Sequence, residues 1–138
     1  MIGLIAGKGE RGMEGLIRAG VGLMLALAFS LPLTAEEFTP DASRGEKTFQ
    51  TICAHCHNIT YDESRVGSPG LKGVLERHDE KWLHQWLKGP EAFAKVDETA
   101  ATLIESNKYK IKMPTFPQMQ DDQHRADMIE YLKTLKGD

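Results

Sequence analysis

The sequence predicts an all-α domain in which four or five short helices pack around a cofactor. Apolar residues recur at helical spacing in several segments, most clearly in residues 80–88 and 123–135. No segment alternates apolar and polar residues for long enough to indicate a β-strand. The chain has only two cysteines, Cys53 and Cys56, and a domain this small benefits from an attached group that completes its apolar centre.

The first 35 residues differ from the rest and are expected to be a secretory signal peptide, which leaves residues 36–138 as the functional domain. An apolar run over residues 19–33 follows Arg18 and ends in the small residues before Glu36. This run is shorter than the roughly 20 residues that a membrane-spanning helix needs. An uncleaved N-terminal anchor is the alternative to a cleaved signal.

The composition of the chain excludes some classes of function. Of the 138 residues, 41% are hydrophobic and 27% are charged, and the net charge is −3. These are ordinary values for one globular domain. The mildly acidic balance gives no reason to expect a nucleic-acid partner.

The first helix of the domain is expected over about residues 44–56. Asp41 or Ser43 is its candidate N-cap, and Glu46 stands three residues after Ser43 in capping-box position. A polar loop then leads to a tight turn over residues 69–73. The two glycines of this turn, at positions 70 and 73, are both expected to adopt unusual backbone angles.

Three more helices are expected after this turn. Asp79 is a suitable cap for a helix over about residues 80–88, which Gly89 and Pro90 then end. A short helix is expected over about residues 97–107, an irregular segment over 108–120, and a last helix over about 123–135.

The most informative motif is Cys53-Ala54-His55-Cys56-His57, at the end of the first helix. Two cysteines three residues apart, followed at once by a histidine, are typical of covalent attachment of a c-type haem. Both thiols can reach the vinyl groups of the haem, and His57 can then bind the iron from one side. A thioredoxin-like redox pair would need a βαβ context, and a zinc site would need further ligands, whereas the remaining histidines are scattered.

The second axial ligand of the iron is sought among the methionines and the free histidines. Met113 is the best candidate because it precedes Pro114, which favours an extended backbone and holds the thioether on a rigid segment outside a helix. Met119 is the second candidate, on the same segment. Met128 lies in the apolar stripe of the last helix and is expected in the core.

Taken together, these motifs resemble the class I c-type cytochromes, which are mono-haem proteins with His and Met ligands. The resemblance covers nearly all of residues 36–138 and rests on the order and spacing of short motifs. These are Gly45 and Phe49 before the cysteine motif, Pro69-x-Leu71-x-Gly73, Met113-Pro114 and Tyr131-Leu132. It implies a cytochrome c-like fold around one covalently bound haem c.

The resemblance also implies roles for several other residues. Gly45 would let the first and last helices cross closely, with Phe49, Met128 and Tyr131 filling the crossing. The carbonyl oxygen of Pro69 would accept the free N–H of His57 and so fix the orientation of the ring. Arg77 would meet a haem propionate. Trp82 or Trp86 could donate an indole N–H there, and simple core packing is the alternative for both tryptophans.

The function expected from the residues and this resemblance is one-electron transfer, with no catalysis. An iron bound by His57 and Met113 has no open coordination site but can change its charge by one electron. The protein would be exported to the periplasm and dock transiently with redox partners. The alternatives are a haem subunit of a larger membrane or periplasmic oxidoreductase complex, held by residues 19–35 if it is tethered, and a five-coordinate haem that reacts with gas molecules or peroxide.

Overall fold

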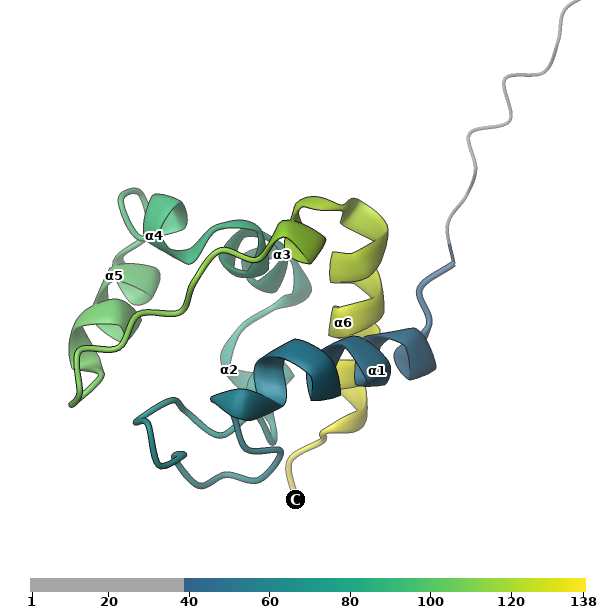
Figure 1. The fold of residues 1–138 in the computed structure, drawn as a ribbon, viewed down its shortest axis with the longest axis horizontal. Helices are drawn as coiled ribbons and strands as arrows, with labels where there is room; N and C mark the ends of the chain where they lie inside the picture. The colour runs from purple at the N-terminus through teal and green to yellow at the C-terminus, as the bar shows by residue number, and fades with distance from the viewer. Residues whose placement is uncertain (1–38) are drawn as a thin grey trace, which may run out of the picture. The chain divides into compact units, whose positions relative to one another are not determined.

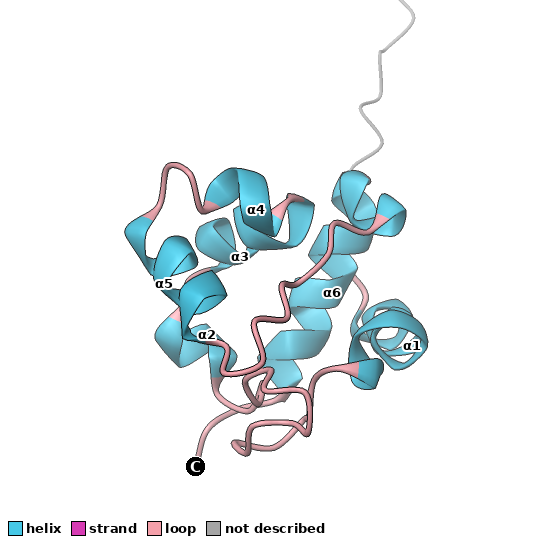
Figure 2. Cartoon of the chain, turned by 60° about the vertical axis from the view of Figure 1, so that its left-hand side comes forward, coloured by secondary structure: helices cyan, strands magenta, loops and turns pink. Residues whose placement is uncertain are grey.

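The computed structural model describes residues 39–138, and every regular element in this range is a helix (Figures 1 and 2). The predicted signal peptide and the alternative anchor lie outside the described residues. The elements are α1 (Ala42–Ile52), the 3₁₀ turn η1 (Cys53–His55), α2 (Val74–Arg77), α3 (Glu80–Lys88), α4 (Pro90–Phe93), α5 (Glu98–Ser106), the 3₁₀ turn η2 (Pro117–Gln120) and α6 (Asp122–Thr134). None of the helices within residues 39–138 has the length and apolar character needed to span a bilayer. The all-α prediction is therefore confirmed.

Two short helices, α2 and α4, were not predicted from the sequence, so the described part holds six α-helices where four or five were expected. Helix α2 begins directly after Gly73, whose φ of 66° ends the preceding turn. Helix α4 begins at Pro90. Proline suits the first position of a helix, because the backbone N–H that it lacks has no partner within the helix there. Gly89 and Pro90 thus end α3, as expected, and also start the next helix.

Helix α1 begins at the cap provided by Asp41. The Asp41 carboxylate accepts hydrogen bonds from the backbone N–H groups of Ser43 and Arg44, at 2.7 and 3.0 Å. The alternative cap at Ser43 with Glu46 is therefore wrong. The helix also ends earlier than expected, at Ile52, and the chain tightens into η1 at the first cysteine.

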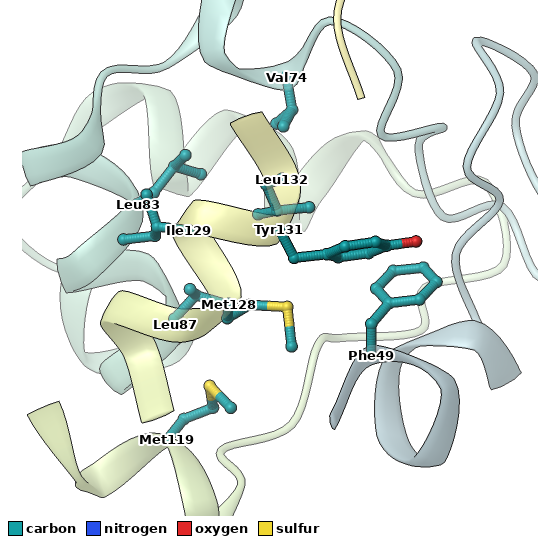
Figure 3. Close-up of a cluster of buried hydrophobic side chains, with 9 residues drawn as sticks. All are labelled: Phe49, Val74, Leu83, Leu87, Met119, Met128, Ile129, Tyr131 and Leu132. Carbon is teal, nitrogen blue, oxygen red and sulfur yellow. The ribbon is translucent and has the colours of Figure 1, made fainter. Parts of the chain in front are cut away.

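The close crossing of α1 and α6 organises the fold (Figure 1). A Cβ atom placed on Gly45 would lie 2.8 Å from Cβ of Tyr131 and closer still to the backbone carbonyl of Asp127. The rings of Phe49 and Tyr131 then pack beside each other with centroids 5.3 Å apart (Figure 3). Only glycine allows the two helices to approach this closely.

A buried carboxylate strengthens the same crossing. Arg44 on α1 donates from Nε to Asp127 Oδ2 at 2.7 Å, and both Gln123 and the backbone N–H of Asp41 donate to Asp127 Oδ1 at 2.8 Å. Burial raises the pKa of Asp127, but these hydrogen bonds together lower it by more, so the pKa of the carboxyl lies below its usual value. The ionised carboxylate therefore stabilises the helix pair above about pH 4.

The apolar core lies between α6, α1 and α3 (Figure 3). Its buried members are Phe49, Val74, Leu83, Leu87, Met119, Met128, Ile129, Tyr131 and Leu132. Met128 is in the core, as the apolar stripe of the last helix indicated. One side of this core opens into the cavity described next, which is also lined by Phe49, Met128 and Leu132.

Candidate functional site

A cavity of about 460 Å³ lies against the core, between the cysteine motif and the segment that carries Met113. Most of the side chains that line it are aliphatic or aromatic. They come from α1, the loop before Pro69, the turn at 69–73, helices α2, α3 and α5, the segment 107–113 and α6. Cys53, His57 and Met113 all line this one cavity, although 60 positions separate Cys53 from Met113 in the sequence.

The imidazole of His57 is held in one orientation and one tautomer. Its Nδ1 lies 2.9 Å from the carbonyl oxygen of Pro69. Because a carbonyl can only accept, Nδ1 carries the proton and Nε2 keeps a free lone pair. Burial lowers the pKa of His57, and the hydrogen bond to Pro69 offsets this only in part, so the ring is neutral at pH 7. A neutral, oriented imidazole is suited to binding a metal ion.

The two cysteines are placed differently. Cys53 lines the cavity, and Cys56 is partly buried but is not part of its wall. Burial, together with the neighbouring Cys56, raises the pKa of Cys53 to about 11, which keeps the sulfur neutral. The backbone N–H groups of Cys56 and His57 both donate to the carbonyl of Cys53, at 3.0 and 2.9 Å. This tight turn brings the two sulfur atoms and the imidazole to the same end of α1.

The two candidate methionines on the segment before α6 have different surroundings. Met113 is partly buried and lines the cavity. Met119 is only 1% exposed, belongs to the core cluster and does not line the cavity. Its backbone carbonyl also accepts a hydrogen bond from Arg125, which ties η2 to α6. Of the two, Met113 is the thioether that the fold presents to the cavity.

The turn at 69–73 is shaped by close approach and by Arg77. Gly73 has a φ of 66°, whereas Gly70 does not have a positive φ, so the expectation of unusual angles at both glycines was wrong. Gly70 is needed for another reason, because a Cβ there would lie only 2.7 Å from the carbonyl oxygen of Asp62. Arg77 donates to the carbonyls of Gly70 and Lys72 at 2.8 and 2.9 Å. Arg77 therefore braces this turn, and it also lines the cavity.

Trp82 and Trp86 form an aromatic wall of the cavity. Their rings stack with centroids 5.3 Å apart, and the ring of His78 stacks on the other side of Trp82 at 4.1 Å. The indole N–H of Trp82 donates to Asp97 Oδ1 at 3.1 Å, so this donor already has a partner in the protein. Of the two tryptophans, Trp86 is therefore the better candidate to donate its indole N–H to a haem propionate, and this hydrogen bond stays a prediction.

The donor set and the cavity fit a covalently bound haem. The cavity is large and mainly apolar, as a porphyrin requires, and it has a neutral imidazole with a free Nε2 and a thioether in its wall. The alternative interpretations of the cysteine motif, a zinc site or a thioredoxin-like redox pair, gain no support from the structure. Within residues 39–138 no cluster of three or more His, Cys, Asp or Glu side chains could hold a metal ion, and no strand flanks the cysteine pair.

Comparison with known proteins identifies the family. A family model described as Cytochrome c matches residues 42–136. This chain belongs to the cytochrome c family. Its fold is that of a class I c-type cytochrome, its cofactor is one covalently attached haem c, and it is an electron-carrying cytochrome.

Individual relatives agree with this assignment. The cytochrome is 31% identical to cytochrome c of Guizotia abyssinica, over 72% of this chain and 94% of that protein. It is also 31% identical to cytochrome c2 of Rhodopila globiformis, over 70% and 94% of the two chains. Among solved structures, it resembles the cytochrome c domain of a Pseudomonas putida protein, with 33% identity and a TM-score of 0.52 over 65% of this chain and 85% of that one.

Two residues with evident roles near the site were missed by the sequence analysis. Asp97 caps α5 through Ala100 N at 2.8 Å and also accepts from Trp82. Asn107, buried at the end of α5, hydrogen-bonds a loop 40 residues earlier in the chain. The Asp before a helical pattern was a recognisable cap signal, but nothing in the sequence marked Asn107, because its partners are backbone carbonyls of a distant loop.

Proposed function

We propose that this cytochrome is an exported carrier of single electrons between redox partners, with His57 and Met113 as the axial ligands of its haem iron and Cys53 and Cys56 as the points of covalent attachment. The observation that supports this most directly is the shared cavity, which has His57 in one part of its wall and Met113 in another. When bound, the haem supplies a metal centre that changes its charge by one electron.

The residues around the iron would allow it to gain or lose an electron with little structural rearrangement. Pro69 holds the His57 ring through Nδ1, which leaves Nε2 free to bind the iron and raises the basicity of the ligand. Met113 would supply the second side-chain ligand of the iron, so that no substrate could reach the metal without displacing its thioether. This argues for electron transfer and against reaction with gas molecules or peroxide.

The optical spectrum of the oxidised holoprotein tests the ligand assignment. A weak sulfur-to-iron charge-transfer band near the red end of the spectrum is expected in the wild type and in Met119→Leu, and it should be absent in Met113→Ala. Met119→Leu is the matched control because Met119 lies in the core, where leucine preserves its volume. Persistence of the band in Met113→Ala, or a high-spin spectrum in the wild type, would overturn the proposal.

Partners would dock where the cavity reaches the surface. Tyr61 and Ile111 both line the cavity, and they are 51% and 45% exposed. Ile59 and Tyr109 add exposed apolar area on the same two loops. A small apolar surface of this kind supports brief, weak association, as is usual between redox proteins. Tyr61→Lys with Ile111→Lys should slow electron exchange with a physiological partner, while the optical spectrum stays unchanged.

Export is proposed from the sequence of residues 1–35. Cleavage after Ala35 would give a secreted protein that begins at Glu36, whereas retention of residues 19–35 would tether it to the membrane, as in a subunit of a larger oxidoreductase complex. Intact-mass spectrometry of the protein purified from whole, detergent-solubilised cells of a haem-maturing bacterial host distinguishes the two. An N-terminus near Glu36 is expected, and a mass that retains residues 19–35 would contradict the free carrier.

A further inference from the structure

Two irregular segments, distant in sequence, meet beside the cavity. One is the loop over residues 58–69, which follows the cysteine motif and ends at Pro69, the partner of His57. The other is the segment from 107 to 116, which leaves α5, carries Met113 and reaches η2 without regular structure (Figures 1 and 2). Such segments have no helical hydrogen bonds of their own, so their position depends on contacts between them.

Asn107 makes the buried contact that joins these segments. Its Nδ2 donates to the carbonyl oxygens of Gly67 and Val66, at 2.8 and 3.2 Å. Its Oδ1 accepts from the backbone N–H groups of Tyr109 and Ile111, at 2.9 and 3.1 Å. The amide is buried, and all of its hydrogen-bonding groups point at backbone. One side chain therefore folds the start of the Met113 segment and fastens it to the opposite loop.

Two other contacts lie close to Asn107. One is an exposed ion pair between the same two loops, and the other is a backbone hydrogen bond to Asn107 itself. Lys108 pairs with Glu63 across the same two loops at 3.1 Å, but both side chains are about half exposed, so water screens the pair. Lys110 has a positive φ of 57°, which is uncommon outside glycine, and its N–H donates to the carbonyl of Asn107 at 2.9 Å. The backbone at this turn is thus held in a conformation that it would not adopt by preference.

We propose that Asn107 is a positioning residue for the sixth iron ligand: by holding the Met113 segment against the loop that ends at Pro69, it keeps the thioether on the iron. This inference rests on the proposed ligation by Met113. The link is mechanical, because Gly67 lies two residues before Pro69, whose carbonyl fixes His57. Asn107 therefore couples the wall that holds one axial ligand to the segment that carries the other.

Binding of imidazole to the oxidised holoprotein measures how firmly Met113 is held, because exogenous imidazole must displace the thioether. Asn107→Ala should bind imidazole roughly tenfold more tightly than the wild type, since loss of several buried hydrogen bonds favours the open segment. A tenfold change corresponds to about 1.4 kcal/mol. The sulfur-to-iron band should also weaken in this variant. Lys108→Gln is the matched control: it breaks the exposed contact between the same loops and should change imidazole affinity less than about twofold.

A second substitution separates the link between the loops from the local turn. Asn107→Asp keeps an oxygen that can accept from Tyr109 and Ile111, but its carboxylate is ionised at pH 7 and faces the carbonyls of Val66 and Gly67 without a donor. The proposal predicts that it behaves like Asn107→Ala. If Asn107→Asp matches the wild type, Asn107 only shapes its own turn and the proposal is wrong.

Two further variants complete the test. Gly67→Ala acts from the opposite loop, because Gly67 has a φ of 75° and a Cβ there would lie 3.1 Å from Asn107 Nδ2. Gly67→Ala should also raise the affinity for imidazole, as Asn107→Ala does. It replaces Asn107→Ala in the test if that variant yields no holoprotein. Met113→Ala is the reference for an open site. If it binds imidazole no more tightly than the wild type, the ligand assignment itself fails. If it binds far more tightly while both Asn107 variants and Gly67→Ala match the wild type, only the role of Asn107 is refuted.

Discussion

Substitution of Gly45 by alanine tests whether the α1–α6 crossing is as close as the structure shows. A Cβ at this position would lie 2.8 Å from Cβ of Tyr131 and even closer to the backbone carbonyl of Asp127. Neither atom can rotate away, so the helices must separate, and the Phe49–Tyr131 ring contact must loosen. Overpacking of this kind costs about 3 kcal/mol. In a free helix the same change would stabilise by about 1 kcal/mol.

The net expectation is therefore a loss of about 2 kcal/mol in the free energy of unfolding, or roughly 10 °C in Tm for a domain of this size. Guanidinium unfolding of the oxidised holoprotein, followed by far-UV circular dichroism, measures it. Glu46→Ala, at the exposed neighbouring position, is the control and should change stability by less than about 0.5 kcal/mol. Equal or greater stability of Gly45→Ala would show that the crossing is not limited by sterics.

Three further substitutions test other parts of the account. Asp127→Asn should destabilise the protein by about 1–3 kcal/mol at pH 7, because the Arg44 guanidinium loses its ionic partner. Since the folded state lowers the pKa of Asp127, this contribution should vanish as the pH falls below about 4, so that acid unfolding of the variant and the wild type converges. Asp97→Ala removes the cap of α5 and the acceptor for Trp82, so a lower Tm is expected in thermal unfolding, whereas an unchanged Tm would contradict both roles. Cys53→Ser should leave at most one thioether, seen as a much lower yield of haem that resists acid–acetone extraction, and an unchanged yield would exclude Cys53 as an attachment point.

The helices with strong local signals could be predicted from the sequence. The helix expected over residues 80–88 is observed as α3 with the expected bounds. It was predictable because Asp79 has the residue type of a cap and the apolar spacing is regular. For the first helix, Asp41 and Ser43 are both acceptable caps by residue type, and only packing against α6 selects Asp41. Helix α4 was missed because a Gly-Pro pair is a stop signal as readily as a start.

The site could be predicted to the extent that its parts are local motifs. The cysteine motif and the Met-Pro pair each have a chemical meaning in their own few residues, and the structure places Cys53, His57 and Met113 around one cavity. Contacts that depend on tertiary packing could not be predicted in this way. Asn107 is one asparagine among polar neighbours, and its role depends on which carbonyls the fold brings within hydrogen-bonding distance. Trp82 has the same limitation, since its partner Asp97 lies 15 residues away.

The axial ligand set is the central claim of this account, and iron-edge X-ray absorption of the oxidised holoprotein measures it most directly. One sulfur scatterer and five nitrogen scatterers are expected around the iron in the wild type, and the sulfur should be lost in Met113→Ala. An iron with no sulfur neighbour in the wild type, or one that keeps its sulfur in Met113→Ala, would contradict it.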